Sequence, residues 1–166
     1  MTVSGIDFIC AGRDTLEIPG EVLRTGGFNF PEIHNSCEEM ARLARKIKQH
    51  SKNTICMLPF CLTVESEALG AHVNLGNEKA GPRISTFSNN SIEELKEIGM
   101  MDFASGRIKE VLDAVEALSQ SGEIVALNVG GPFTVITSLV DPMIFYKAIK
   151  KNREDVKYVL KIRADI

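Results

Sequence analysis

Residues 123–134, EIVALNVGGPFT, pass from a largely apolar segment directly into two glycines and a proline. A continuous apolar run without alternation is typical of a strand that is buried on both faces, as in a parallel sheet. Glycines at the end of such a strand allow a tight turn or a close approach of the backbone to a ligand. The stretch therefore predicts a strand and a turn, and the residues after it read as helical.

Two other segments read as strands, and helical segments separate all three. Residues 5–12 form a short run of strand-forming side chains closed by a glycine, and residues 54–58 form a second buried-type strand before Pro59. Capping boxes, Ser36 with Glu39 and Ser91 with Glu94, mark two helix starts. The predicted helices cover residues 21–25, a segment from residue 36, and residues 62–69, 91–98, 107–120 and 152–166.

The order of elements is strand then helix, three times over, which predicts a parallel α/β sheet with helical crossovers. Three strands cannot close a TIM barrel, which usually needs about 250 residues. A flavodoxin-like sheet would need about five strands. The last helical segment has no glycine or proline stop before residue 166. We therefore expect a partial (β/α)8-type barrel, represented by its first three βα units.

Composition restricts the class of protein. The chain has 166 residues, 44% hydrophobic and 25% charged, with a formal net charge of −3. No apolar run reaches the roughly 18 residues that span a bilayer, and no basic block suggests nucleic acid. The four cysteines are irregularly spaced and no secretory signal precedes them, so we expect a cytoplasmic protein with reduced thiols. A small molecule or another protein is the expected partner.

Three ordered motifs carry a family resemblance. They are FPEIH at residues 30–34 with MARLA at 40–44, PFCLTVESEALG at 59–70 with a later Gly81-Pro82, and NVGGPFT at 128–134. Together the motifs resemble the methylcobamide:coenzyme M methyltransferases, which share a fold with uroporphyrinogen decarboxylase. The resemblance extends from about residue 28 onward. It implies that residues 1–166 form the N-terminal portion of a barrel of this superfamily.

The decarboxylase branch of that superfamily fits this sequence less well. The decarboxylases carry arginines at the end of the first strand, and only Arg13 is present here. They also carry an aspartate after the second strand, where this chain has Cys61. A cysteine cannot serve as a permanent anion facing pyrrole nitrogens. The resemblance thus implies a corrinoid-dependent methyltransferase, with a decarboxylase-like enzyme of tetrapyrrole metabolism and a non-catalytic half-barrel as the alternatives.

The loops after the second and third strands are expected to hold the ligand, because loops at the carboxyl ends of barrel strands face it. Helix-start N–H groups there could hold an anion, such as a sulfonate or a carboxylated tetrapyrrole. A purely structural role, a tight turn at the glycines and packing at Cys61, accounts equally well for these residues. The candidate substrate-binding residues are Arg13, Phe60, Cys61, Glu65, Gly130, Gly131 and Thr134.

The resemblance also implies cofactors and partners. In the methyltransferase branch zinc binds a small thiol substrate and holds it as a thiolate, and the methyl group resides on a corrinoid carried by a partner protein. The zinc ligands of the family lie in the second half of the barrel. The nearest pattern in this chain, His34 with Cys37, is expected to have a surface capping role, so we predict no metal site here. The chain is expected to pair with the missing half or with itself, and to be inactive alone.

Overall fold

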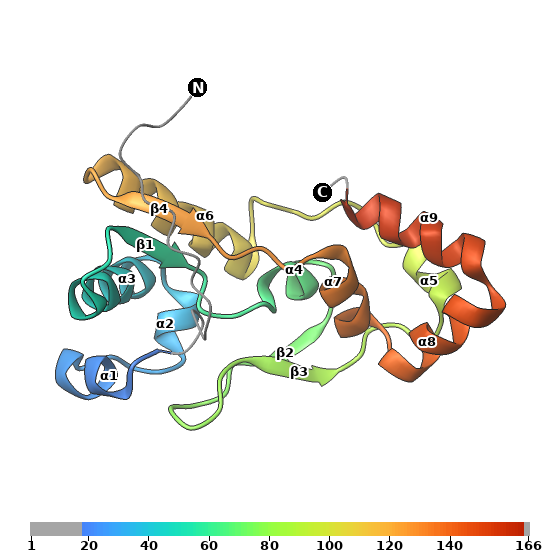
Figure 1. Cartoon of the computed structure of the whole chain (residues 1–166), viewed down its shortest axis with the longest axis horizontal. Helices are drawn as coiled ribbons and strands as arrows, with labels where there is room; N and C mark the ends of the chain where they lie inside the picture. Colours follow the sequence, from blue (N-terminus) through green and yellow to red (C-terminus); the bar gives the residue numbers. More distant parts are fainter. Residues whose placement is uncertain (1–17, 165–166) are drawn as a thin grey trace.

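The structure is a computed structural model that describes residues 18–164 (Figure 1). The strand predicted at residues 5–12, and Arg13, lie outside this range. The described elements are α1 (Gly20–Gly26), α2 (Glu32–Asn35), α3 (Cys37–Ser51), β1 (Ile55–Leu58), α4 (Val64–Ala68), β2 (His72–Asn74), β3 (Arg83–Thr86), α5 (Ile92–Lys96), α6 (Gly106–Gln120), β4 (Ile124–Leu127), α7 (Pro132–Leu139), α8 (Pro142–Lys151) and α9 (Arg153–Ala164).

The two predicted strands within this range pair with each other in parallel. β1 and β4 run in register, with Ile55 opposite Ile124 and Leu58 opposite Leu127. Parallel neighbours need a long crossover, and the segment from α4 to α6 provides it. The prediction of a parallel α/β arrangement is therefore confirmed.

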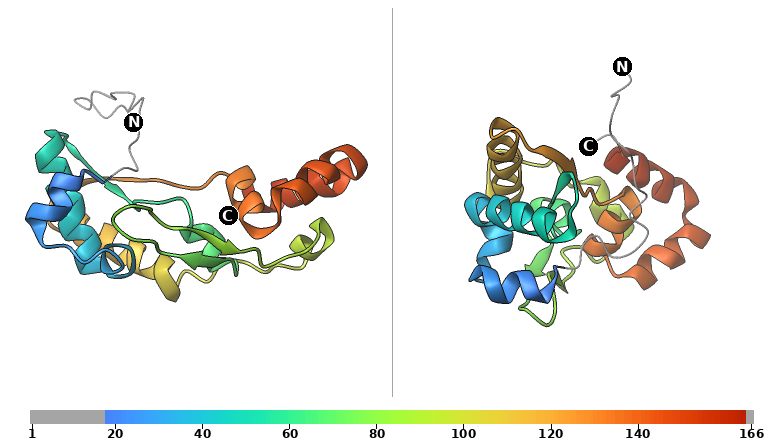
Figure 2. Two further views of the ribbon diagram at one scale, coloured as in Figure 1. Left: turned by 90° about the horizontal axis from the view of Figure 1, so that it is seen from below. Right: turned by 60° about the vertical axis from the view of Figure 1, so that its left-hand side comes forward.

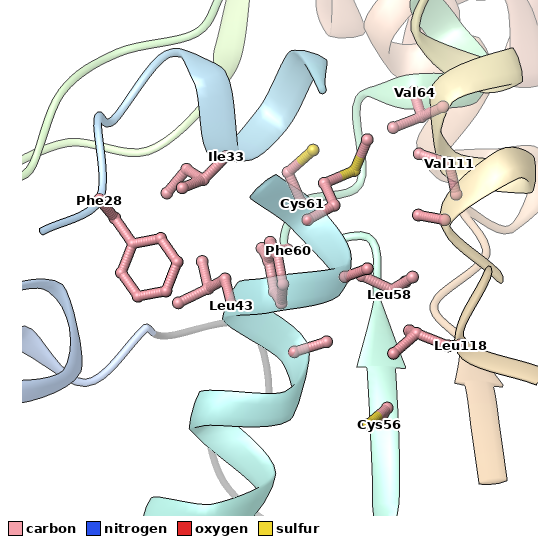
Figure 3. Close-up of a cluster of buried hydrophobic side chains, with 14 of the residues drawn as sticks. Phe28, Ile33, Leu43, Cys56, Leu58, Phe60, Cys61, Val64, Val111 and Leu118 are labelled. Carbon is pink, nitrogen blue, oxygen red and sulfur yellow. The ribbon is translucent and has the colours of Figure 1, made fainter. Parts of the chain in front are cut away.

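Helices α3 and α6 pack on one face of this strand pair. Cys56 and Leu58 of β1 point into that face and are fully buried, whereas the alternate residues Ile55 and Met57 are half-buried. Leu43 of α3 and Leu118 of α6 complete the core, as Figure 3 shows. The predicted cap of α3 is confirmed because the Ser36 hydroxyl accepts from the Glu39 amide at 3.4 Å.

A second core lies at the other end of the molecule. Figure 2 shows α5, α8 and α9 at the end away from α1 and α3, with α7 leading towards them from β4. Phe145 of α8 is fully buried there against Ile136 and Leu139 of α7. The Ser91 hydroxyl caps α5 by accepting from the Glu94 amide at 3.3 Å. The Glu94 carboxylate accepts a hydrogen bond from the backbone amide of Asn90, not from that of Ser91 as in a capping box.

An antiparallel hairpin, β2 with β3, interrupts the predicted order of elements. Val73 pairs with Ile84 and Asn74 with Arg83, and the strands are short and largely exposed. The turn needs glycine at position 76, where φ is +79° and a Cβ atom would lie 1.9 Å from the Ala80 carbonyl oxygen. Sequence analysis missed the hairpin because its polar side chains give neither an apolar run nor a clear alternation. None of the helices in the described range is long and apolar enough to cross a membrane.

Candidate functional site

The carboxyl ends of β1 and β4 lie side by side and are joined by hydrogen bonds. The Asn128 amide donates to the Leu58 carbonyl oxygen at 2.6 Å, which extends the strand pairing beyond β4 by one bond. The Asn128 side-chain amide donates to the Pro59 carbonyl oxygen at 3.0 Å. Asn128 therefore fixes the loop after β1 against the loop after β4.

Glu65 forms a second connection between these loops. The Gly130 amide donates to Glu65 Oε1 at 2.9 Å. A Cβ atom on residue 130 would lie 3.3 Å from Glu65 Oε2, tighter than most carbon–oxygen contacts, so glycine leaves room for the carboxylate. Glu65 is only 9% exposed, and its Oε2 atom has no hydrogen-bond partner within residues 18–164.

A pocket of about 390 Å³ opens beside this connection, between α4, α6, the end of β4 and the start of α7. Its lining includes Glu65, Asn128, Gly130 and Gly131. The remaining walls are apolar. They are formed by Pro59, Val64, Leu69, Met101, Phe103, Ile108, Val111, Leu112, Leu127, Val129, Pro132 and Val135.

A buried arginine side chain binds the loop after β1. The Arg107 side chain is 3% exposed. Its guanidinium donates to the Thr63 hydroxyl at 2.8 Å and to Cys61 Sγ at 3.4 Å, and it forms an ion pair with Glu67. Thr63 in turn donates to Cys61 Sγ at 3.4 Å. These bonds hold the Cys61 thiol in the protein interior.

Sequence analysis missed Arg107, although a signal was present. Arg107 shares one face of α6 with Val111, Ala114 and Leu118, at spacings of four, seven and eleven residues. An arginine on the apolar face of a helix requires a buried partner, because an unpaired charge in the interior is very costly. Because Arg107 lies in the first turn of the helix, the sequence pattern did not distinguish it from a solvent-exposed residue.

His34 was predicted to have a surface capping role, and this prediction was wrong. The residue is 3% exposed, and its ring packs edge-on near Phe30 and Phe60, with centroids 5.1 and 6.3 Å away. Burial, together with a smaller contribution from the positive charge of Arg107, lowers the pKa of His34 to about 4. The imidazole is therefore neutral near pH 7. The reason for the error is that α2 turns Ile33 and His34 towards the core.

Residues 9–166 match the family model described as uroporphyrinogen decarboxylase (URO-D). The chain belongs to this family. The URO-D match covers most of the chain, and it confirms the superfamily to which the sequence motifs pointed.

The chain is similar to curated methyltransferases and to the solved structure of one methyltransferase. It is 30% identical over 122 residues to a methylcobamide:CoM methyltransferase of Methanosarcina mazei, covering 74% of the chain and 34% of that protein. It is 29% identical over 150 residues to one of Methanosarcina barkeri, covering 87% and 44%. The structure of a methyltransferase from Methanosarcina mazei superposes with a TM-score of 0.78 at 28% identity, covering 87% of this chain and 44% of that one. The chain thus spans less than half the length of these relatives.

Five of the seven sequence-predicted site residues fall into two groups in this URO-D chain. Glu65, Gly130 and Gly131 line the pocket. Phe60 and Cys61 belong to the core behind the loop, among Ile33, Leu43 and Leu58 (Figure 3).

Thr134 lies on α7, where its carbonyl oxygen accepts from the Ser138 hydroxyl at 2.8 Å, and it is absent from the lining of the pocket. Arg13 lies outside the described residues. Ligand binding by any of these residues stays a prediction.

The zinc ion that the resemblance implies does not fit the described side chains. Across residues 18–164, no three His, Cys, Asp or Glu side chains come together in a group that could hold a metal ion. His34 and Cys61 are both buried, and the Cys61 sulfur already accepts two hydrogen bonds. The described residues therefore form a pocket but no group of side chains that could hold zinc.

Proposed function

We propose that the chain is the N-terminal portion, residues 1–166, of a corrinoid-dependent methyltransferase that moves a methyl group between a methylcobamide and a small thiol. The position of Cys61 carries the choice of branch. A decarboxylase of this family would need a carboxylate at that place facing the tetrapyrrole. Here a thiol occupies the place, and Arg107 and Thr63 hold it in the core. The methyltransferase relatives support the same choice.

The site residues take supporting roles in this proposal. Glu65 and Gly130 fix the two loops at the carboxyl ends of β1 and β4, where ligands of parallel barrels bind. Gly131 lines the pocket, and no atom lies within 4 Å of the position that a Cβ would take there. The role of Arg13, Phe60 and Thr134 in binding is part of the proposal and has no contact in the described residues to support it.

Zinc, when bound, would supply an activated thiolate. We assign its ligands to the remainder of the barrel, since the described residues present no suitable group.

The proposed partners are the remainder of the barrel and a corrinoid protein. In the described range β4 pairs only with β1, which leaves its other edge open. Leu112 and Leu127, beside that edge, are 39% and 48% exposed. Open edges and apolar patches recruit further strands or subunits. We infer that the rest of the barrel, in the same polypeptide or in another one, covers this surface. Where that part is missing, we infer that copies of this chain associate through the same surface.

A chimeric enzyme tests the proposed function. Residues 9–166 would replace the matching part of the Methanosarcina mazei methyltransferase, with the parent enzyme as the positive control. We expect methyl transfer from methylcobalamin to coenzyme M. The Cys61→Ser variant should retain most of the activity, because Cys61 lies outside the pocket. A folded chimera, verified by circular dichroism, that leaves methylcobalamin unchanged would contradict the proposal.

A further inference from the structure

Helix α8 buries one face and exposes the other. Phe145 is fully buried in the second core, whereas Met143 and Tyr146 are 61% and 49% exposed. Lys147 and Lys150 are exposed as well. Counted from Met143, the other three exposed side chains follow at spacings of three, four and seven residues, which places all four on one side of a helix. We call this stripe of Met143, Tyr146, Lys147 and Lys150 the α8 face.

The α8 face continues to the first turn of α7. Phe133 follows Pro132, a residue of the pocket lining, and is 47% exposed. Its ring lies near that of Tyr146, with ring centroids 6.3 Å apart. Phenylalanine, tyrosine and methionine are enriched in protein interfaces, and exposed apolar side chains that gather in one patch mark sites of interaction. The α8 face therefore has the composition of a protein-binding surface that adjoins the candidate site.

The charge of this surface is positive. Helix α8 contains no acidic residue, and the two acidic residues in the first turn of α9 are already paired: Asp155 with Lys96 and Glu154 with Lys157. Other exposed basic side chains of α8 and α9 form no ion pair within residues 18–164. They are Lys147, Lys150, Lys151 and Arg153. The α8 face therefore presents apolar groups beside ammonium groups that have no acidic partner in the described part of the chain.

The charges also decide what kind of occupant fits. Burial of Lys147 and Lys150 under an apolar layer of the barrel would be costly, because an unpaired charge loses its hydration. The surface beside Leu127 of β4, which we assign to the rest of the barrel, lies towards the opposite end of the molecule from α8 (Figure 1). A bilayer fits poorly, since the large apolar side chains of α8 face the second core. A nucleic acid would be repelled by the net charge of −3.

We propose that the α8 face docks an acidic surface of another protein. Met143 and Tyr146 make the apolar contacts, while Lys147 and Lys150 pair with carboxylates around them, the arrangement of an apolar centre with a charged rim. This inference deepens the proposed function, in which a protein partner carries the corrinoid. Because Phe133 joins the α8 face to the loop after β4, a protein docked there lies beside the carboxyl ends of the strands.

The test is a titration by fluorescence anisotropy with a short fluorescein-labelled peptide in which glutamates flank two phenylalanines. The 166-residue chain and the chimeric enzyme are both titrated, and a peptide with glutamine at every glutamate position is the neutral comparison. Wild type should prefer the acidic peptide, and added salt should reduce that preference. Lys147→Gln combined with Lys150→Gln should weaken its binding about three- to tenfold, as expected for two exposed ion pairs. Tyr146→Ser should weaken the binding of both peptides.

Lys46→Gln combined with Lys79→Gln is the matched control. It changes the net charge by the same amount at two exposed lysines, one on α3 and one between β2 and β3. This variant should bind the acidic peptide as wild type does. Equal losses in the two double variants, equal binding of the two peptides, or no binding by wild type would overturn the proposal.

Two further outcomes would also overturn it. Binding by the isolated chain that the chimera lacks would show that the rest of the barrel covers the α8 face. Tighter binding to phosphatidylglycerol vesicles or duplex DNA than to the peptide, lost with Lys147 and Lys150, would assign the α8 face to another class of partner. The methyl-transfer assay of the chimera uses free methylcobalamin and needs no docked protein, so the two proposals fail separately.

Discussion

The guanidinium of Arg107 donates a hydrogen bond to the hydroxyl of Thr63 across 2.8 Å. This bond joins the first turn of α6, which leads into β4, to the loop that leaves β1. The same guanidinium binds Cys61 and Glu67, so one buried side chain positions the whole segment before α4. Because α4 carries Glu65, the geometry of the pocket depends on Arg107 although Arg107 is absent from its lining.

Arg107→Met should destabilise the fold strongly. It removes hydrogen bonds from a charged group and leaves the Thr63 hydroxyl without its donor, which we expect to cost about 2–3 kcal/mol. Urea unfolding measures the change. Lys109→Met is the control on the same helix, because Lys109 is 47% exposed and pairs with Asp113 one turn away. That substitution should cost less than about 0.5 kcal/mol; equal losses in the two variants would contradict the assigned role.

The stability of the chain should fall as the pH falls from about 6.5 to about 4, the range set by the ordinary and the lowered pKa of His34. The folded protein holds the imidazole neutral, whereas the unfolded chain takes up a proton below its ordinary pKa. Stability from this group is therefore complete above pH 6.5 and is lost towards pH 4. Each unit of pKa difference corresponds to about 1.4 kcal/mol.

Urea unfolding at several pH values checks this prediction, with His34→Phe as the comparison. Phenylalanine retains the aromatic contacts with Phe30 and Phe60 and cannot titrate. The variant should lose much less stability over the same pH range. Parallel pH profiles for the two proteins would show that His34 is not the group responsible.

Much of the fold followed from the sequence, and the exceptions have physical reasons. β1 and β4 were predictable from continuous apolar runs. α3 was predictable from apolar residues at helical spacing and its capping box, and α6 from the same spacing and the glycine that follows it. The β2–β3 hairpin was missed because its strands bury little apolar surface.

Glu65 and the two glycines, which were predicted from their position after strands, line the pocket, and ligand binding by them stays a prediction. The buried network of Arg107 was not predicted, because its partners come from residues 61–67, about 40 positions away in the chain.

The two adjacent glycines should respond differently to alanine. Gly130→Ala brings a Cβ atom to 3.3 Å from Glu65 Oε2 and 3.5 Å from Val135 Cγ2, so it should cost about 1–3 kcal/mol, as overpacking does. Gly131→Ala meets no atom within 4 Å and should change stability by less than about 1 kcal/mol. Thermal unfolding of both variants measures the difference. A larger loss for Gly131→Ala would mean that the turn is packed differently.

The chain in isolation should self-associate through the apolar surface beside β4. Leu127→Lys places a charge on that surface and should shift the population towards monomer in multi-angle light scattering. Tyr158→Lys, on α9 at the other end of the molecule, changes a side chain that is 55% exposed and should leave the population unchanged. A wild-type chain that remains monomeric at all concentrations would contradict the prediction.

The central claim is that this chain belongs to a methyltransferase and not to a decarboxylase. The most direct measurement is product analysis of the folded chimera in one mixture that contains methylcobalamin, coenzyme M and uroporphyrinogen. The predicted result is methylated coenzyme M together with demethylated cobalamin, while the porphyrinogen keeps all its carboxylates. Release of carbon dioxide from the porphyrinogen, with methylcobalamin left intact, would contradict the claim.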